Sequence, residues 1–264
     1  ALFSLGFLED IEFKISPKFR LLFMIISLII FINLFSLSIN SVDLVFLSSW
    51  MHNNLFSIFF LVLCFLFIIN GSNLIDGFNG LLSIHLIIIN LILLFLNLNN
   101  DYQNIIWILI SQIIILFSFL VFNFPKAQIF MGDSGSYLFG SITALSIIKT
   151  NNNNPEISSF FFCILLFYLF FEVFFSFFRK ISQRKSPLLP DENHLHMLVY
   201  RGLKQKGWKN ANPVTGFVIN FFYLALIIPA LFNILNPLFC KFWFFFLIFI
   251  YSLVFYYLFG SKKI

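Results

Sequence analysis

The sequence predicts an all-α, polytopic membrane protein. Hydrophobic residues make up 60% of the 264 positions and charged residues only 10%, whereas a soluble domain carries about 25% charged residues. The few charged residues lie mostly between long apolar runs. We therefore expect a bundle of membrane helices whose polar chemistry is confined to one face of the membrane.

Eight apolar runs are long enough, or nearly long enough, to cross a bilayer, which takes roughly 20 residues, or about 17 in a straight helix. The runs are Leu21–Leu37, Leu55–Ile69, Leu81–Leu96, Ile105–Phe122, Gly135–Ile148, Ile157–Phe178, Val214–Leu235 and Leu238–Phe259. The second and fifth are short. We therefore expect their helices to include flanking residues, to be tilted, or to be partly re-entrant in the membrane. We treat residues 1–264 as one integral membrane domain.

The basic residues predict the orientation of the bundle. If all eight runs cross, fourteen of the sixteen Lys and Arg residues fall on one side, and only Lys149 and Lys241 fall on the other. Loops rich in Lys and Arg stay in the cytoplasm. We therefore expect a multi-pass protein of the plasma (inner) membrane with its active site on cytoplasmic loops. The three cysteines lie in apolar runs and imply no disulfide framework.

Four segments on the expected cytoplasmic side carry the unusual polar residues: 6–12, 70–80, 123–136 and 186–196. Seven of the eleven acidic residues belong to them, namely Glu9, Asp10, Glu12, Asp76, Asp133, Asp191 and Glu192. In a chain this poor in charge, acids beside glycines and basic residues suggest phosphate chemistry at the membrane surface.

The segment 70–80 is a glycine-punctuated loop between two apolar runs. Asn70 and Asn73 offer neutral donors and acceptors beside the carboxylate of Asp76, and the glycines allow a ligand to approach the main chain. An ordinary interfacial turn is the alternative interpretation of this loop.

Asp133 has Gly132 before it and Gly135 two residues after it. Mg²⁺ is typically held by one or two carboxylates together with substrate phosphates. Capping of the following helix would explain a single Asp or Ser here, but not the whole run Met-Gly-Asp-Ser-Gly-Ser.

His194 and His196 would share one face in an extended segment, and prolines just upstream favour extended backbone. Their closeness to Asp191 and Arg184 favours anion binding over simple solvation.

Glu172 is an acid within the sixth apolar run, and such acids mark functional sites by default. It precedes Arg179 by about two helical turns, so a structural pair with Arg179 or with a neighbouring helix is an equal alternative. For His85, early in the third run, we expect a packing role.

Two motifs in one membrane chain carry a family resemblance: Asn-x-x-Asn-x-x-Asp-Gly at 70–77 and Phe-Met-Gly-Asp-Ser-Gly-Ser at 130–136. The chain resembles the polyprenyl-phosphate N-acetylhexosamine-1-phosphate transferases (glycosyl transferase family 4). This superfamily includes UDP-N-acetylglucosamine–undecaprenyl-phosphate GlcNAc-1-phosphate transferases and phospho-N-acetylmuramoyl-pentapeptide transferase. The matching residues run in the expected order from Gly6 to Gly202.

The resemblance implies transfer of an N-acetylhexosamine 1-phosphate from a UDP-sugar to undecaprenyl or another polyprenyl phosphate. The products are the polyprenyl-diphosphate sugar and UMP, in cell-envelope polysaccharide biosynthesis. The implied partners are the UDP-sugar and the lipid, with no nucleic acid, and a homodimer is left open. Family members also carry two or three helices before the first motif, which fits a chain that starts at Ala1 without an initiator Met.

The resemblance also assigns roles to residues. Glu9 and Asp10 stand where the family has an aspartate pair at the lipid phosphate, and Asp133 matches the acid that holds Mg²⁺, with Mn²⁺ as an alternative. Residues implied to be catalytic are Glu9, Asp10, Asp76, His194 and His196, and those implied to bind substrate are Asn70, Asn73, Asn79, Arg184 and Lys185. Glu172 resembles an acid that the family often keeps at this helix end.

Four positions depart from the family pattern. Glu9 replaces the first Asp of the pair, and Asn79 replaces the second acid of Asp-Gly-x-Asp-Gly. Lys126 interrupts the usual Pro-Ala, and Met197 replaces the last histidine of the cluster. A catalytically degenerate or truncated protein of the same fold is therefore one alternative. A transporter that uses Glu172 is another, and it requires further buried charges or broken helices along a path.

Overall fold

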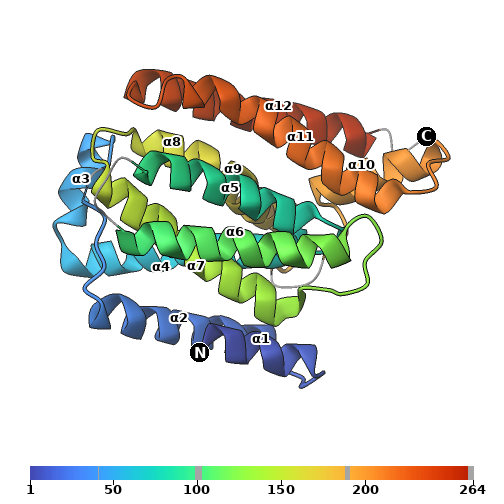
Figure 1. The fold of residues 1–264 in the computed structure, drawn as a ribbon, viewed down its shortest axis with the longest axis horizontal. Coiled ribbons are helices and arrows are strands. Elements are labelled where there is room, and N and C mark those ends of the chain that lie inside the picture. Colours follow the sequence, from blue (N-terminus) through green and yellow to red (C-terminus); the bar gives the residue numbers. More distant parts are fainter. Residues whose placement is uncertain (41, 99–102, 188–190, 261–264) are drawn as a thin grey trace.

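The computed structural model describes residues 1–40, 42–98, 103–187 and 191–260, and every helix or strand in this part is an α-helix. The helices are α1 (Leu2–Asp10), α2 (Pro17–Leu34), α3 (Val45–Met51), α4 (Asn54–Ile75), α5 (Leu81–Asn97), α6 (Gln103–Asn123), α7 (Gly132–Asn153), α8 (Ser159–Leu165), α9 (Phe167–Ser182), α10 (Leu195–Gln205), α11 (Ala211–Leu231) and α12 (Pro237–Gly260). The predicted all-α bundle is confirmed (Figure 1).

All eight apolar runs form helices that lie along the bundle, and successive ones run in opposite directions (Figure 1). The sixth run forms two helices, α8 and α9. The turns from α4 to α5 and from α6 to α7, the end of α1 and helix α10 gather at the right-hand end of Figure 1, whereas α3 lies at the opposite end. The four polar segments therefore meet at one end of the bundle.

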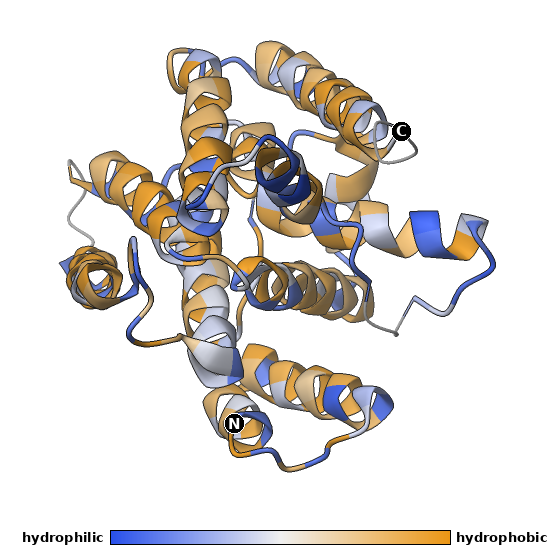
Figure 2. Cartoon of the chain, turned by 90° about the vertical axis from the view of Figure 1, so that its right-hand side faces the viewer, coloured by the Kyte–Doolittle hydropathy of each residue, from blue (hydrophilic) through white to orange (hydrophobic). Residues whose placement is uncertain are grey.

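Five of the described helices are long and apolar enough to cross a membrane on their own: α2, α4, α6, α11 and α12. Helices α8 and α9 qualify together as a sixth, bent span. Helix α5 is apolar but has only 17 residues. Apolar residues cover most of the helix surfaces in Figure 2, and hydrophilic ones concentrate in the turns and short helices facing the viewer. The chain is a multi-pass membrane helix bundle.

Helix α7, the fifth expected span, is long enough to cross but too polar to be recognised as a span by composition. Its Thr143 and Thr150 are fully buried, and Asn97 of α5 donates a hydrogen bond of 2.9 Å to the hydroxyl of Thr150. Gln112 of α6 contacts the hydroxyl of Thr143 at 3.5 Å. Neighbouring helices therefore satisfy the polar groups of α7 inside the bundle, where an apolar surface towards lipid is not needed.

Two segments expected as loops are helical. Helix α4 continues through Ile75, so that only residues 76–80 of the expected loop remain non-helical, and the segment before the first span forms α1. The extension of α4 is held by packing: Gly71 is buried, and a Cβ at this position would lie 2.1 Å from the carbonyl oxygen of Leu169. The close approach of α4 and α9 thus depends on the missing side chain.

Helices α8 and α9 meet at a bend of 77°. At the bend, Tyr223 of α11 donates a hydrogen bond of 2.5 Å to the carbonyl oxygen of Leu165. On the other side of α9 lies a cavity of about 360 Å³ with almost entirely apolar walls, which include Cys64 of α4 and Phe174 of α9. The bundle therefore contains an apolar cavity that begins beside the bend.

His85 has the packing role expected from the sequence. The side chain is fully buried between α5 and α11, and its Nδ1 lies 3.1 Å from Oδ1 of Asn220. Asn220 also donates to the carbonyl oxygen of Leu81 at 3.0 Å.

We expect Gly71→Ala to destabilise the protein by about 1–3 kcal/mol, the usual cost of overpacking, because its methyl group would collide with the backbone of Leu169. Thermal unfolding in detergent measures this as a fall in Tm of roughly 2–4 °C per kcal/mol. Gly202→Ala in α10 is the matched control, because its Cβ would meet open space. Equal Tm values for the two variants would contradict the proposed close approach.

Candidate active site

The carboxylate of Asp10 caps the N-terminus of α7. The backbone N–H groups of Asp133 and Ser134 donate to its two oxygens at 2.8 and 3.0 Å, and the Ser134 hydroxyl donates at 2.6 Å. The N-cap residue of α7 itself makes no side-chain cap. Because the first N–H groups of a helix lack partners within it, α1 supplies a partner from outside. Burial alone would raise the pKa of Asp10, but these hydrogen bonds lower it below its ordinary value.

Gly132 makes this cap sterically accessible. Its φ is +69°, a conformation that side chains rarely adopt, and a Cβ would lie 2.7 Å from Oδ1 of Asp10. The glycine before Asp133 is thus required by the approach of α1, in addition to any role in ligand binding.

Asp133 lies in the first turn of α7 and faces α4. Asn73 donates to its Oδ1 at 2.5 Å and also reaches the hydroxyl of Ser136 at 3.2 Å. The alternative in which Asp133 caps α7 is wrong, since Asp10 holds the N-terminal N–H groups. Asp133 instead joins α7 to the polar end of α4.

Asp76 is the C-cap residue of α4 and completes a cluster of three carboxylates with Asp10 and Asp133. Burial, followed by repulsion from Asp133 and Asp10, raises the pKa of Asp76 to about 8, although a hydrogen bond from the Gly132 N–H opposes this. Three segments far apart in the sequence therefore bring three acidic side chains to one place.

Glu9 lies near this cluster, since burial and then the charges of Glu9 and Asp10 raise the pKa of Asp133. Its two carboxylate oxygens contact Arg20 of α2 at 3.2 Å and the hydroxyl of Tyr137 on α7 at 2.9 Å. The residue expected to pair with Asp10 in catalysis therefore joins α1 to two other helices. Its catalytic role stays a prediction.

Two of the expected substrate-binding asparagines make contacts within the protein. The side-chain nitrogen of Asn70 donates to the carbonyl oxygen of Leu66 on its own helix at 2.7 Å. Asn79 donates from its side chain to the carbonyl oxygen of Pro125 at 2.8 Å, and its backbone N–H donates to Asn212. Asn79 thus ties the α4–α5 turn to the segment before α7. Substrate binding by either residue stays a prediction.

The two histidines stack as expected for an extended start: His194 has extended backbone, and the two rings are 5.5 Å apart with an interplanar angle of 8°. His196 lies against Phe78, with ring centroids 5.4 Å apart, and its Nδ1 is 3.1 Å from the hydroxyl of Tyr168. Phe78 follows Asp76 by two residues, so the histidines adjoin the turn that carries this acid.

Burial lowers the pKa of His196 to about 4. The imidazole is therefore neutral near pH 7 and offers hydrogen bonds rather than positive charge. The ring is also enclosed, with 1% of its surface exposed. The catalytic role expected of His196 stays a prediction.

Glu172 pairs with His194 and not with Arg179. Its Oε2 lies 3.1 Å from Nδ1 of His194. Arg179 instead forms an ion pair with Asp191 and donates to the carbonyl oxygen of Asn193 at 3.0 Å. Burial opposes ionisation of Asp191, but Arg179 keeps its pKa below the ordinary value. The end of α9 thus holds the segment that leads into α10.

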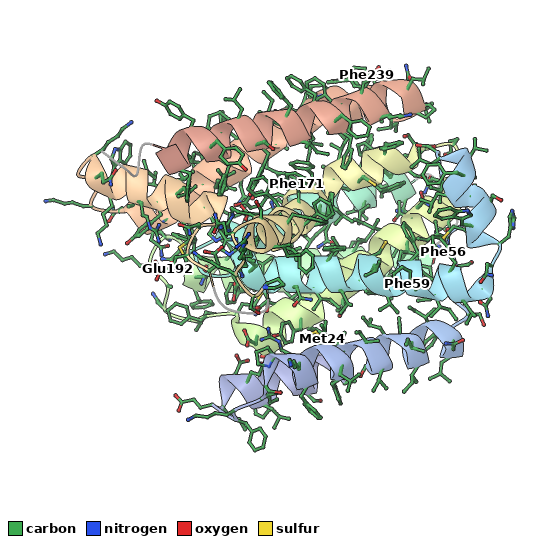
Figure 3. All side chains as sticks on the ribbon, turned by 180° about the vertical axis from the view of Figure 1, so that it is seen from behind. Met24, Phe56, Phe59, Phe171, Glu192 and Phe239 are labelled. Carbon is green, nitrogen blue, oxygen red and sulfur yellow. The ribbon has the colours of Figure 1, made fainter. Side chains whose placement is uncertain are left out.

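Arg184 and Lys185 are exposed just after α9. Their backbone N–H groups close the helix by donating to the carbonyl oxygens of Ile181 and Lys180 at 2.9 and 2.8 Å. No described contact joins their side chains to the three carboxylates. The nitrogen and oxygen atoms of this end of the bundle lie around the labelled Glu192 in Figure 3, far from Phe239.

The sequence interpretation missed Ser134, Tyr137 and Arg20 as parts of this region. Ser134 stood beside Asp133 in the motif and could have been singled out. The contacts of Arg20 and Tyr137 with Glu9 depend on how α1, α2 and α7 meet, which spacing along the chain does not reveal.

Among the described residues, no group of three or more His, Cys, Asp or Glu side chains is arranged to hold a metal ion. Mg²⁺ typically takes only one or two protein carboxylates, with water and phosphate oxygens completing its shell. Binding of Mg²⁺ by Asp133 stays a prediction.

The family of the chain follows from a comparison of sequences. The model of glycosyl transferase family 4 matches residues 1–151, more than half of the chain, so the chain belongs to this family. The resemblance seen in the motifs is thereby confirmed.

Individual relatives agree with the family. The chain is 29% identical over 168 residues to the undecaprenyl-phosphate alpha-N-acetylglucosaminyl 1-phosphate transferase of Thermotoga maritima. The aligned stretch covers 63% of this chain and 50% of the relative. It is 32% identical over 167 residues to the phospho-N-acetylmuramoyl-pentapeptide-transferase of Dictyoglomus turgidum, and this alignment covers 61% of the chain and 50% of the relative. A probable undecaprenyl-phosphate N-acetylglucosaminyl 1-phosphate transferase of Bacillus subtilis is 29% identical over 130 residues, and this alignment covers 49% of the chain and 36% of the relative. The chain spans half or less of the length of these relatives.

We expect the cluster to make metal-free protein less stable as pH rises. The unfolded chain releases the proton of Asp76 near pH 3.8, whereas the folded chain keeps it up to about pH 8. The folded state binds the extra proton between these values, so stability falls from about pH 4 to about pH 8. Asp76→Asn removes this contribution. The Tm of the variant relative to wild type should rise by about 2 °C or more between pH 5 and 8.5, the shift that roughly 1 kcal/mol produces.

The control is Glu192→Gln, whose side chain is 84% exposed. The Tm of this variant should change with pH in the same way as the Tm of wild type across the same range. Parallel curves for Asp76→Asn as well would contradict the raised pKa of Asp76.

Proposed function

We propose that the chain belongs to an enzyme that transfers a sugar 1-phosphate of the N-acetylhexosamine type from a UDP-sugar to a polyprenyl phosphate. The observation that carries the proposal is the cluster of Asp10, Asp76 and Asp133 at one end of a membrane bundle. The activities for which the relatives are named supply the reaction class.

The reaction joins two anions. An oxygen of the lipid phosphate forms a bond to the sugar-linked phosphorus of the donor, and the bond from that phosphorus to the UMP oxygen breaks. UMP leaves, and the product is a polyprenyl-diphosphate sugar. Catalysis of such a transfer is mainly positioning and electrostatic stabilisation of charge.

The acidic region around Asp133 would suit a divalent cation that takes one protein carboxylate and completes its shell with water and phosphate oxygens. Burial, followed by repulsion from Asp133 and Asp10, raises the pKa of Asp76, and a bound cation would relieve the repulsion. Asp133 would hold Mg²⁺, with Mn²⁺ as an alternative, and the ion would neutralise the donor diphosphate. Asn73 would keep the Asp133 carboxylate oriented through its 2.5 Å hydrogen bond.

Other parts of the chain suit the two substrates. Asp10 would lie by the lipid phosphate, while Arg184, Lys185 and His194 would meet phosphate charge. The apolar cavity of about 360 Å³ between α4 and α9 would hold part of the isoprenoid chain. We place the site on the cytoplasmic side of the plasma membrane because the basic residues gather at that end.

A catalytically inactive member of the family is the second candidate. The observation in its favour is that Arg20 and Tyr137 occupy both oxygens of Glu9. Transfer of radiolabelled sugar phosphate from a panel of UDP-sugars to undecaprenyl phosphate, in membranes that contain the full-length protein, separates the candidates. Labelled lipid with release of UMP supports the transferase. Well-folded protein that labels no lipid, with Glu9 or with Glu9→Asp, supports the inactive member.

We expect Asp133→Asn to lower Mg²⁺-dependent turnover by at least about 100-fold, because an electrostatic group of this kind typically contributes that much. The assay is the same lipid labelling, with and without Mg²⁺. Glu192→Gln, exposed and outside the cluster, is the control. Near-normal turnover of Asp133→Asn would refute the metal assignment.

A further inference from the structure

Glu172 is a buried acid that makes two directed contacts with the start of α10. The side chain is 1% exposed within α9. One carboxylate oxygen lies 3.1 Å from Nδ1 of His194, and the other accepts a hydrogen bond of 2.9 Å from the backbone N–H of Leu195. Because both carboxylate oxygens are engaged, Glu172 holds the ring of His194 and the backbone of Leu195 at the same time.

These contacts restrict how His194 can meet a ligand. With Nδ1 held by Glu172, Nε2 is the ring nitrogen left for an external partner. The parallel ring of His196, 5.5 Å away, covers one face of the imidazole. His196 is itself held by the hydroxyl of Tyr168 and the ring of Phe78.

The segment before His194 has its own anchors. Arg179 holds Asp191 and the carbonyl oxygen of Asn193, and Lys180 donates to the carbonyl oxygen of Pro187 at 3.3 Å. The path of this segment therefore does not depend on Glu172 alone. What Glu172 adds is the orientation of one ring.

We propose that Glu172 is a positioning residue that acts through His194, holding the imidazole so that its Nε2 meets a phosphoryl oxygen of the substrate. The inference rests on the proposed transferase function. It differs from the intramembrane transport role considered for Glu172, because both oxygens of the carboxylate are committed to the start of α10.

A double-mutant cycle on turnover tests the proposal. In membranes containing the full-length protein, we expect Glu172→Gln to lower kcat about 10–100-fold, the usual cost of losing such a supporting contact, with little change in KM for the UDP-sugar. In the His194→Ala background, the same substitution should cost less than about 2-fold further, because its target is already gone. Glu192→Gln, on the same segment, should leave kcat unchanged.

Glu172→Asp keeps the proposal testable if Glu172→Gln does not fold. Aspartate retains the charge on a shorter side chain, so kcat should lie between the values of wild type and Glu172→Gln. In the His194→Ala background this substitution should again cause no further loss of kcat. Losses that multiply in the double variant would overturn the proposal while leaving the transferase function intact. If the wild-type protein transferred no sugar phosphate from any donor, both the transferase function and the positioning role of Glu172 would be overturned.

Discussion

The cap that Asp10 places on α7 is the contact on which the polar end of the bundle depends. A single carboxylate accepts two backbone N–H groups and one hydroxyl of α7. It thereby fixes α1 against a helix that begins more than a hundred residues later. Without this contact the first turn of α7 would have unsatisfied donors and a positive helix end, and Asp10 would no longer be bonded to the backbone of Asp133.

The same contact changes how the site can handle anions. The N-terminus of a helix commonly binds phosphate through its free N–H groups, but here a side chain of the protein occupies that position. Asp133 adds a second carboxylate beside it, and Asp76, whose pKa burial and repulsion raise to about 8, adds an acid that keeps its proton near pH 7. An anionic substrate must therefore be met by a cation or by the basic and imidazole groups around the end of α9. The acidic cluster and the histidine region thus have complementary tasks.

The sequence predicted the class of fold, the position of every long helix and the end of the bundle where polar residues gather, because hydropathy and charge distribution decide these. It did not predict the extension of α4 or the formation of α1, which depend on packing against α7 and α9. The motif residues Asp76 and Asp133 were found from their glycine neighbours. The partners of Glu9 and Glu172 were not, because helix spacing shows which residues share a face but not which residue from another element meets them.

The bend between α8 and α9 has a consequence for the opposite side of the bundle. Where a helix breaks at membrane depth, a freed carbonyl needs a donor from within the protein, and the hydroxyl of Tyr223 donates to Leu165 there. Tyr223 belongs to α11 and does not line the cavity between α4 and α9. The bend beside the cavity is thus satisfied by a hydroxyl on a helix that does not line the cavity.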